Sequence, residues 1–129
     1  MASKTEALKE RYKLFSQGDL AGALDLWTDD FVWDGDESGL PGSGRHEGKQ
    51  AATEVLQKTV GAYDTFDLSA DEFIEQDDTV VVLGHMDVTK DDRAAHLPVV
   101  HIWRYRGDMM CRLQILSDTL KTAQTLGLA

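Results

Sequence analysis

The stretch "LPVVHIWRYRGDMMCRLQILSDT", residues 97–119, decides the fold, because it predicts two β-strands joined by a tight turn at Gly107-Asp108. Side chains alternate across a strand, so every second residue shares a face. One face of the first strand carries Val99, His101, Trp103 and Tyr105. An imidazole in the middle of an apolar strand is either a hydrogen-bonded structural group or a group that faces a pocket.

Two more strands are expected before this hairpin. Residues 66–74 alternate loosely, a turn follows at Asp77-Asp78, and residues 79–89 are rich in β-branched side chains. The segment "KDDRAAH", residues 90–96, is expected to link them to the hairpin. His85 shares a face with Asp87 on the strand next to the one that carries His101. If both of these faces point inward, the two histidines project into one cavity, but alternation alone leaves open which faces do.

The rest of the sequence predicts three helices and one strand in the N-terminal half, and one more short helix near the C-terminus. A capping-box pattern at Ser3 begins the first helix, which Gly18 ends, and Asp19 caps a second short helix that runs through Trp27. The remaining elements are a strand at 31–33, a loop at 34–44, a helix at 48–63 and a last short helix capped by Asp118. The expected architecture is one α+β domain over residues 1–129, with helices covering one face of a curved antiparallel sheet.

Composition excludes several classes of partner. The formal net charge is −10, with 13 Lys and Arg against 23 Asp and Glu, which disfavours nucleic acids and acidic membrane surfaces. The N-terminal segment from Met1 to Glu6 lacks a targeting pattern, and no apolar run has transmembrane length, so a cytoplasmic location is expected. The single cysteine, Cys111, excludes an intrachain disulfide, and the histidines lack the close spacing of metal sites. Neither a metal nor a cofactor is expected.

Four segments together resemble the nuclear transport factor 2-like superfamily, and within it the SnoaL-like polyketide cyclases and ketosteroid-isomerase relatives. They are "QGDLAGALDLWTDDFVW", "GRHEGKQAATEVL", "VVVLGHMDV" and the quoted hairpin. The resemblance covers nearly the whole chain. It implies a cone-shaped α+β barrel whose open end forms an apolar pocket, commonly with dimerisation through the sheet. It says less about activity, because this superfamily includes several kinds of enzyme as well as transport factors.

The catalytic patterns of two relatives are only partly present. Alignment with ketosteroid isomerase places its oxyanion-binding aspartate at His101 and its general base at Gly35, next to Asp34. The isomerase tyrosine falls on Arg11, next to Tyr12. The epoxide-hydrolase relatives fit no better. Dehydratase relatives use a sheet histidine with an aspartate near the end of the first strand, and His101, His85 and Asp34 resemble that combination.

The resulting hypothesis is a cofactor-independent lyase, isomerase or cyclase that acts on a hydrophobic carbonyl compound. His101 is the leading acid-base or oxyanion-stabilising group, His85 assists, and Asp34 orients or accepts a proton. The candidate binding residues are Trp33, Trp103, Tyr12, Phe15, Gln114 and Asp118. Each has a plainer interpretation as core aromatic, edge residue or helix cap.

The alternative is a non-catalytic ligand-binding or dimerisation domain, because both established catalytic patterns are lost. A homodimer is expected in either case, since the face that carries Val100 and Ile102 needs cover if the opposite face lines a pocket.

Overall fold

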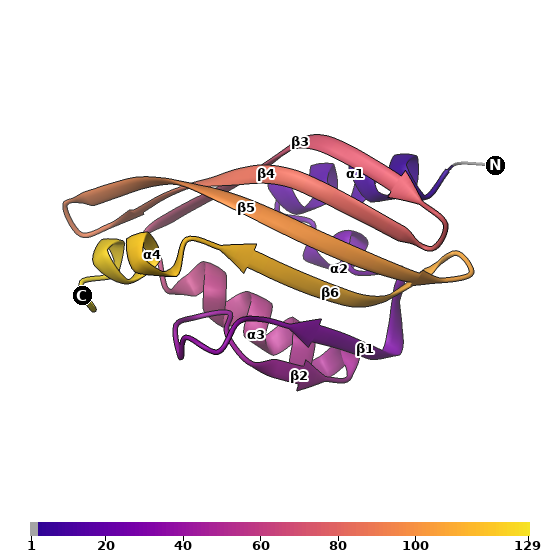
Figure 1. The fold of residues 1–129 in the computed structure, drawn as a ribbon, viewed down its shortest axis with the longest axis horizontal. Helices are drawn as coiled ribbons and strands as arrows, with labels where there is room; N and C mark the ends of the chain where they lie inside the picture. Colours follow the sequence, from indigo (N-terminus) through magenta and orange to yellow (C-terminus); the bar gives the residue numbers. More distant parts are fainter. Residues whose placement is uncertain (1–2) are drawn as a thin grey trace.

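The computed structural model describes residues 3–129, which form one six-stranded sheet and four helices (Figure 1). Met1 and Ala2, which belong to the segment judged to lack a targeting pattern, lie outside the described residues. The helices are α1 (Lys4–Ser16), α2 (Leu20–Ala23), α3 (Lys49–Gly61) and α4 (Thr119–Thr125). The strands are β1 (Trp27–Asp34), β2 (Arg45–Glu47), β3 (Thr65–Gln76), β4 (Thr79–Lys90), β5 (Arg93–Arg106) and β6 (Met109–Ser117).

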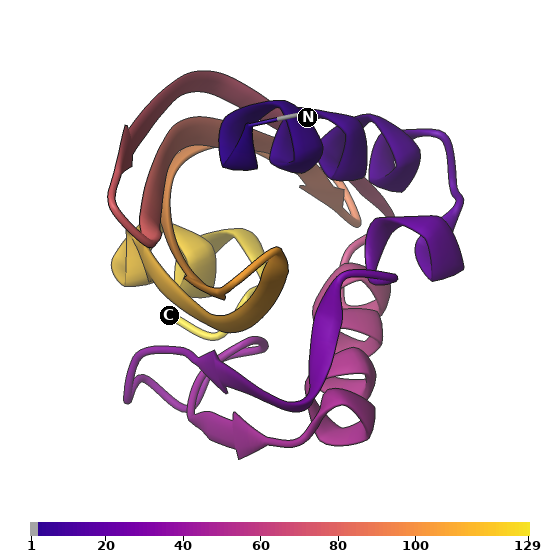
Figure 2. The same ribbon diagram turned by 90° about the vertical axis from the view of Figure 1, so that its right-hand side faces the viewer.

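The sheet is mixed rather than purely antiparallel. Its order is β2-β1-β6-β5-β4-β3, in which β3 to β6 form an antiparallel meander. Strand β1 is antiparallel to β2 but parallel to β6, so the sheet joins the two halves of the chain. Figure 2 shows the sheet bent into an incomplete ring, with α1 and α3 along the side that it leaves open. The predicted α+β class, with a curved sheet and packed helices, is confirmed.

The predicted hairpin is also confirmed, because β5 and β6 pair across a turn at Gly107-Asp108. Gly107 has φ +61°, a left-handed conformation that glycine adopts at little cost in a tight turn. The inner face of the two strands meets the helices in the core. The largest fully buried side chains are Phe31, Leu8, Leu97, Met110, Val80, Val82 and Val88.

The structure differs from the sequence prediction at α2 and β1, at the start of β5, and in a short strand that was not predicted. Helix α2 ends at Ala23, and Trp27 instead begins β1, where it pairs with Met110 and stacks on Phe31 at 3.9 Å between ring centroids. The apolar spacing that fits a helix here reflects tertiary burial. Strand β5 already begins at Arg93, so the expected link over 90–96 shrinks to a two-residue turn at Asp91-Asp92. Strand β2 has only three polar residues and left no periodic signal.

No helix within residues 3–129 has both the length and the apolar character needed to cross a membrane.

Candidate functional site

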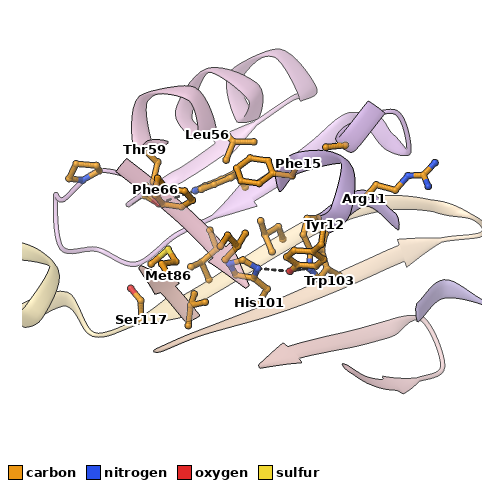
Figure 3. A pocket seen from close by; sticks show the side chains of 18 of the residues that line it. Arg11, Tyr12, Phe15, Leu56, Thr59, Phe66, Met86, His101, Trp103 and Ser117 are labelled. Carbon is orange, nitrogen blue, oxygen red and sulfur yellow. Dashed lines mark hydrogen bonds between the residues drawn. The ribbon is translucent and has the colours of Figure 1, made fainter. Parts of the chain in front are cut away.

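A mostly apolar cavity of about 120 Å³ lies between the inner face of the sheet and helices α1 and α3 (Figure 3). Helix α1 contributes Tyr12 and Phe15, and α3 contributes Leu56. The sheet contributes aromatic and aliphatic side chains, with His101 among them. Pockets for small molecules commonly combine such walls with a few polar groups that fix orientation.

Three of the lining side chains form a hydrogen-bonded network. The Tyr12 hydroxyl lies 2.6 Å from Nδ1 of His101, and the indole nitrogen of Trp103 donates to the same hydroxyl at 3.0 Å. Two of these residues come from one face of β5, as the alternation predicted, and Tyr12 reaches them from α1. The network therefore ties the first helix to the centre of the sheet.

The hydrogen bonds of this network favour one tautomer of His101. An indole N–H can only donate, so the Tyr12 oxygen accepts from Trp103. Within residues 3–129 the Tyr12 hydroxyl has no acceptor for its own proton other than Nδ1 of His101, which favours donation to that nitrogen. The neutral ring then carries its hydrogen on Nε2. No group within residues 3–129 accepts a hydrogen bond from that Nε2 atom. His101 thus offers the apolar cavity one N–H donor that the protein itself leaves available.

Burial keeps this network electrically neutral. His101 is 8% exposed, and desolvation lowers its pKa from the ordinary value of 6.5 to about 4. Desolvation likewise raises the pKa of Tyr12 far above its usual range, an effect that the hydrogen bond from Trp103 only partly offsets. At neutral pH the imidazole is therefore a hydrogen-bond donor rather than a cation.

Polar side chains that the sequence analysis did not select also line the cavity. They are Arg11, Asp36, Thr59, Tyr63, Ser117 and Thr122. Arg11 is held by Asp25, with two N···O distances of 2.9 and 3.0 Å, and in Figure 3 its guanidinium group points away from His101. Asp36 is the carboxylate at the cavity, and one of its oxygens accepts from the Ser38 backbone N–H at 2.8 Å.

The loop after β1 brings Asp36 to the cavity by folding back tightly on itself. A Cβ atom at Gly35 would lie 2.1 Å from the Gly42 carbonyl oxygen, so only glycine permits this approach. The Trp33 indole donates to the same carbonyl at 2.9 Å. The glycine-rich composition of 34–44 signalled a loop, but it carried no information about the path of that loop.

Five of the residues selected from the sequence line the cavity together. They are Tyr12, Phe15, Trp33, His101 and Trp103. Asp118 does not line it, because its side chain caps α4 by accepting from the Lys121 backbone N–H at 2.9 Å. Asp118 is therefore the N-cap of α4, which was the alternative interpretation of this residue.

His85 lies on the opposite face of the sheet, so the expected convergence of two histidines is not found. The pairing of β4 with β5 sets Val82 opposite His101, and Val82 is 1% exposed on the inner face. Alternation then turns Met86 into the cavity and His85 outward. His85 instead lies beside Asp71, Asp87 and His96.

Asp34 and Gln114 also face away from the cavity. They pair with each other across β1 and β6, one position beyond the inward-facing pair Trp33 and Leu113. The Asp34 carboxylate accepts a hydrogen bond from Arg112. That carboxylate is therefore engaged in an ion pair away from the cavity.

Comparison with known proteins agrees with this architecture. The model of the SnoaL-like domain family matches residues 8–113. An NTF2-like protein of unknown function from Burkholderia pseudomallei has a TM-score of 0.87 and 27% identity, with 98% of each chain covered. TerC, which was co-crystallised with polyporic acid, has a TM-score of 0.86 and 29% identity, with 96% of this chain and 98% of that chain covered.

A more distant relative has the same fold. IdmH from Streptomyces antibioticus, described as a candidate polyketide cyclase, has a TM-score of 0.77 and 18% identity, with 98% of this chain and 99% of that chain covered. No curated protein matches the chain. The family model spans most of the sequence, and the solved structures repeat its curved sheet and helices. The chain therefore belongs to the SnoaL-like domain family, within the nuclear transport factor 2-like superfamily.

Proposed function

We propose that the protein binds a hydrophobic carbonyl compound in the cavity and catalyses a lyase, isomerase or cyclase reaction on it. One arrangement carries the proposal: with Tyr12 donating to Nδ1 of His101, the Nε2–H faces a mostly apolar cavity and has no acceptor within residues 3–129. A carbonyl oxygen is the complementary acceptor. The same hydrogen bond strengthens when negative charge develops on that oxygen, because water is excluded and the donor is already oriented.

The chemistry needs a base as well as this donor. In the proposed step the Asp36 carboxylate takes a proton from the carbon beside the carbonyl. The C–H electron pair forms the enolate, and the negative charge on its oxygen is held by His101. Asp36 takes the role that the sequence analysis gave to Asp34, whose carboxylate binds Arg112. His101 acts by hydrogen bonding, since a pKa of about 4 makes it a weak proton acceptor.

Similarity to TerC supports the class of ligand. That protein was crystallised with polyporic acid, and the two chains match over nearly their whole lengths. Polyporic acid is therefore the first probe for this cavity. The aromatic side chains of Phe15, Trp33 and Phe66 are suited to packing against a flat organic molecule.

The experiment measures binding and proton exchange separately. Binding of polyporic acid is measured by calorimetry, and the imidazole NMR signals of His101 in the wild type show whether the compound enters the cavity. A panel of hydrophobic ketones is incubated in D₂O to detect deuterium beside the carbonyl. Exchange is expected for at least one ketone and is expected to disappear in Asp36→Asn, while binding remains. His101→Leu is expected to weaken binding about tenfold, the effect of one lost hydrogen bond. His46→Gln, which changes a histidine outside the cavity, serves as the control and is expected to leave both unchanged.

A non-catalytic ligand-binding domain is the second candidate, because no carboxylate among residues 3–129 contacts His101. Binding by the wild type without exchange of any ketone would favour it. Absence of any response at His101 to every compound would remove both candidates.

We also propose a cytoplasmic homodimer that covers the outer face around Val100 and Ile102, both half-buried in the single chain. Analytical ultracentrifugation is expected to give twice the mass of the chain. A single species at the mass of the chain over a wide concentration range would contradict the dimer.

A further inference from the structure

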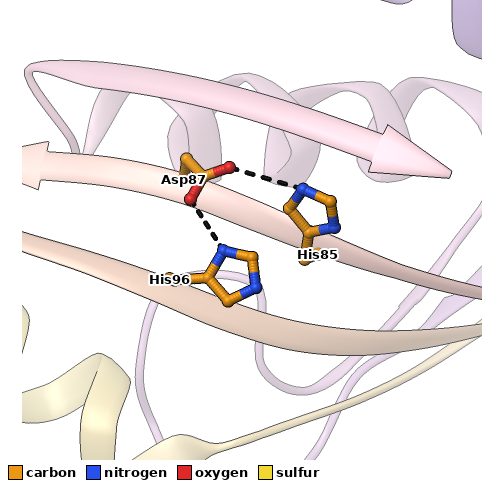
Figure 4. Close-up of side chains that lie close together, drawn as sticks. All are labelled: His85, Asp87 and His96. Atoms are coloured by element: carbon orange, nitrogen blue, oxygen red, sulfur yellow. Dashed lines mark hydrogen bonds and ion pairs between the residues drawn. The ribbon is translucent and has the colours of Figure 1, made fainter. Parts of the chain in front are cut away.

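A second cluster of ionisable side chains lies on the outer face of the sheet, away from the cavity (Figure 4). His85 and Asp87 are two residues apart on β4 and so share a face, and His96 on β5 pairs directly with Asp87. The ligand atoms of these three residues all lie within 4.8 Å of one another. The cluster is near the β4–β5 turn and is open to solvent, since the side chains of His96 and Asp87 are 59% and 53% exposed.

Two distances within the cluster are near those of a first coordination shell, and the shorter of them is a hydrogen bond that a bound ion would replace. Asp87 Oδ1 lies 2.8 Å from His96 Nδ1, and Asp87 Oδ2 lies 3.4 Å from His85 Nε2. Nitrogen and oxygen ligands bind Zn²⁺ at about 2.0–2.2 Å, so two ligands of a tetrahedral ion are separated by roughly 3.3 Å. Small rotations of exposed side chains would bring all three atoms onto one ion.

A fourth side chain is placed as an outer-shell partner. Asp71 Oδ2 lies 2.7 Å from Nδ1 of His85. A carboxylate at this position keeps the proton on Nδ1 and leaves the lone pair of Nε2 available to a metal, as in carboxylate–histidine–metal arrangements. This contact is built into the backbone, because the pairing of β3 with β4 shifts between Ala70 and Glu72, which leaves Asp71 as the extra residue of a β-bulge.

Gly84 permits that bulge. A Cβ atom at this position would lie 2.2 Å from the Ser69 carbonyl oxygen, so any larger residue would push β3 away from β4. The glycine, the bulge and the Asp71 side chain together aim a carboxylate at the remote nitrogen of His85. An ordinary exposed ion pair needs none of these features.

We propose that His85 Nε2, His96 Nδ1 and Asp87 bind one divalent cation of the Zn²⁺ class, with Asp71 orienting His85 and water completing the coordination. Two imidazoles and one carboxylate suit Zn²⁺ and its borderline neighbours better than Ca²⁺ or Mg²⁺, which prefer oxygen ligands. The imidazole rings are 4.5 Å apart, where two protonated rings would repel each other, whereas a shared cation uses both as neutral ligands. Asp71 and Asp87 balance the charge of the ion.

The absence of close histidine spacing led the sequence analysis to expect no metal. The proposed ligands come from two paired strands, so their spacing along the sequence does not show that they lie close together. The site is independent of the cavity, because these residues and the cavity occupy opposite faces of the sheet.

The test uses the whole chain without a histidine affinity tag, freed of metal with a chelator and titrated with ZnCl₂ in a calorimeter. One Zn²⁺ per chain is expected, with a rise in Tm that saturates at the same ratio. His85→Gln and His96→Ala are each expected to abolish that binding. Asp71→Asn, which keeps the shape of the side chain, is expected to weaken it by about 10–100-fold. His46→Gln is the matched control, since His46 lies outside the cluster and bonds the Ser43 carbonyl oxygen.

Three outcomes would overturn the proposal. They are no heat of binding with the wild type, equal binding by the wild type and both histidine variants, and half a Zn²⁺ per chain, which indicates an ion held between two molecules. Unfolding curves in chelator show whether each variant is folded, so a loss of binding is not confused with a loss of structure.

Discussion

The two faces of the β4–β5 hairpin hold histidines in opposite electrostatic settings. On the inner face His101 is buried, contacts a tyrosine hydroxyl, and has its pKa lowered to about 4 by desolvation. On the outer face His85 and His96 are partly or mostly exposed and lie beside carboxylates. Histidine is thus a neutral hydrogen-bond donor on the inner face and a neighbour of carboxylates on the outer face. Strand alternation separates these roles, although the residues are close in sequence.

The inner face of the hairpin is expected to contribute more than the outer face to the free energy of unfolding. Trp103→Ala removes a large side chain that packs against Trp27, Phe31 and Tyr12, and it is expected to cost about 3–5 kcal/mol in the free energy of unfolding. The neighbouring change Arg104→Ala removes an exposed side chain that donates to Thr79 at 2.7 Å and is expected to cost about 1 kcal/mol or less. Urea denaturation measures both. Equal losses would mean that the two faces contribute alike.

The inner histidine is expected to make stability depend on pH. Because the pKa of His101 falls from 6.5 to about 4 on folding, the unfolded chain binds a proton between these values that the folded chain does not. Stability is therefore expected to fall as the pH drops from 6.5 to 4, by about 3 kcal/mol from this residue. His101→Asn is expected to lack this contribution. The difference between the unfolding free energies of the two proteins, followed from pH 7.5 to 3.5, measures it, and a constant difference would contradict the burial argument.

The Tyr12 hydroxyl is expected to have a smaller but specific effect. Tyr12→Phe leaves Nδ1 of His101 and the indole N–H of Trp103 without their partner, at an expected cost of about 1–3 kcal/mol. Tyr63→Phe is the matched control, because Tyr63 lines the same cavity and its hydroxyl makes no hydrogen bond within residues 3–129. Nitrogen NMR of His101 is expected to show a loss of the single tautomer in Tyr12→Phe only. An unchanged tautomer would mean that another group fixes the ring.

The outer cluster is expected to contribute least to stability in the absence of metal. Asp71→Asn weakens a partly exposed hydrogen bond between the Asp71 carboxylate and His85, so the expected cost in chelator is below about 1 kcal/mol. Thermal unfolding of the wild type and the variant in chelator measures it. A loss as large as that of Tyr12→Phe would show that the β-bulge depends on this pair for its structure.

Much of the inner face was predictable from the sequence, because alternation along β5 depends only on local geometry. His101 and Trp103 share a face in any regular strand, and the cap residues Ser3, Asp19 and Asp118 each start the expected helix. These features need no knowledge of distant residues. They give the fold class and the centre of the cavity.

The faces of the neighbouring strands were not predictable in this way. Whether His85 or Met86 points inward depends on the pairing of Val82 with His101, which is a property of two strands together. The same holds for Asp71, whose direction depends on a bulge. Asp36 reaches the cavity through a loop closure at Gly35 and Gly42 that composition does not encode.

The parallel pairing of β1 with β6 has a consequence for how the protein forms. Strands β3 to β6 meet their neighbours through short turns, whereas β1 finds β6 only after nearly the whole chain is present. Loop closure over such a length is slow, so the meander is expected to assemble first and β1 to dock last. Trp33 and the loop that carries Asp36 arrive with β1. We therefore expect the cavity to be completed in the final step of folding, and the Trp33 side of the cavity to stay open during synthesis until β6 has emerged from the ribosome.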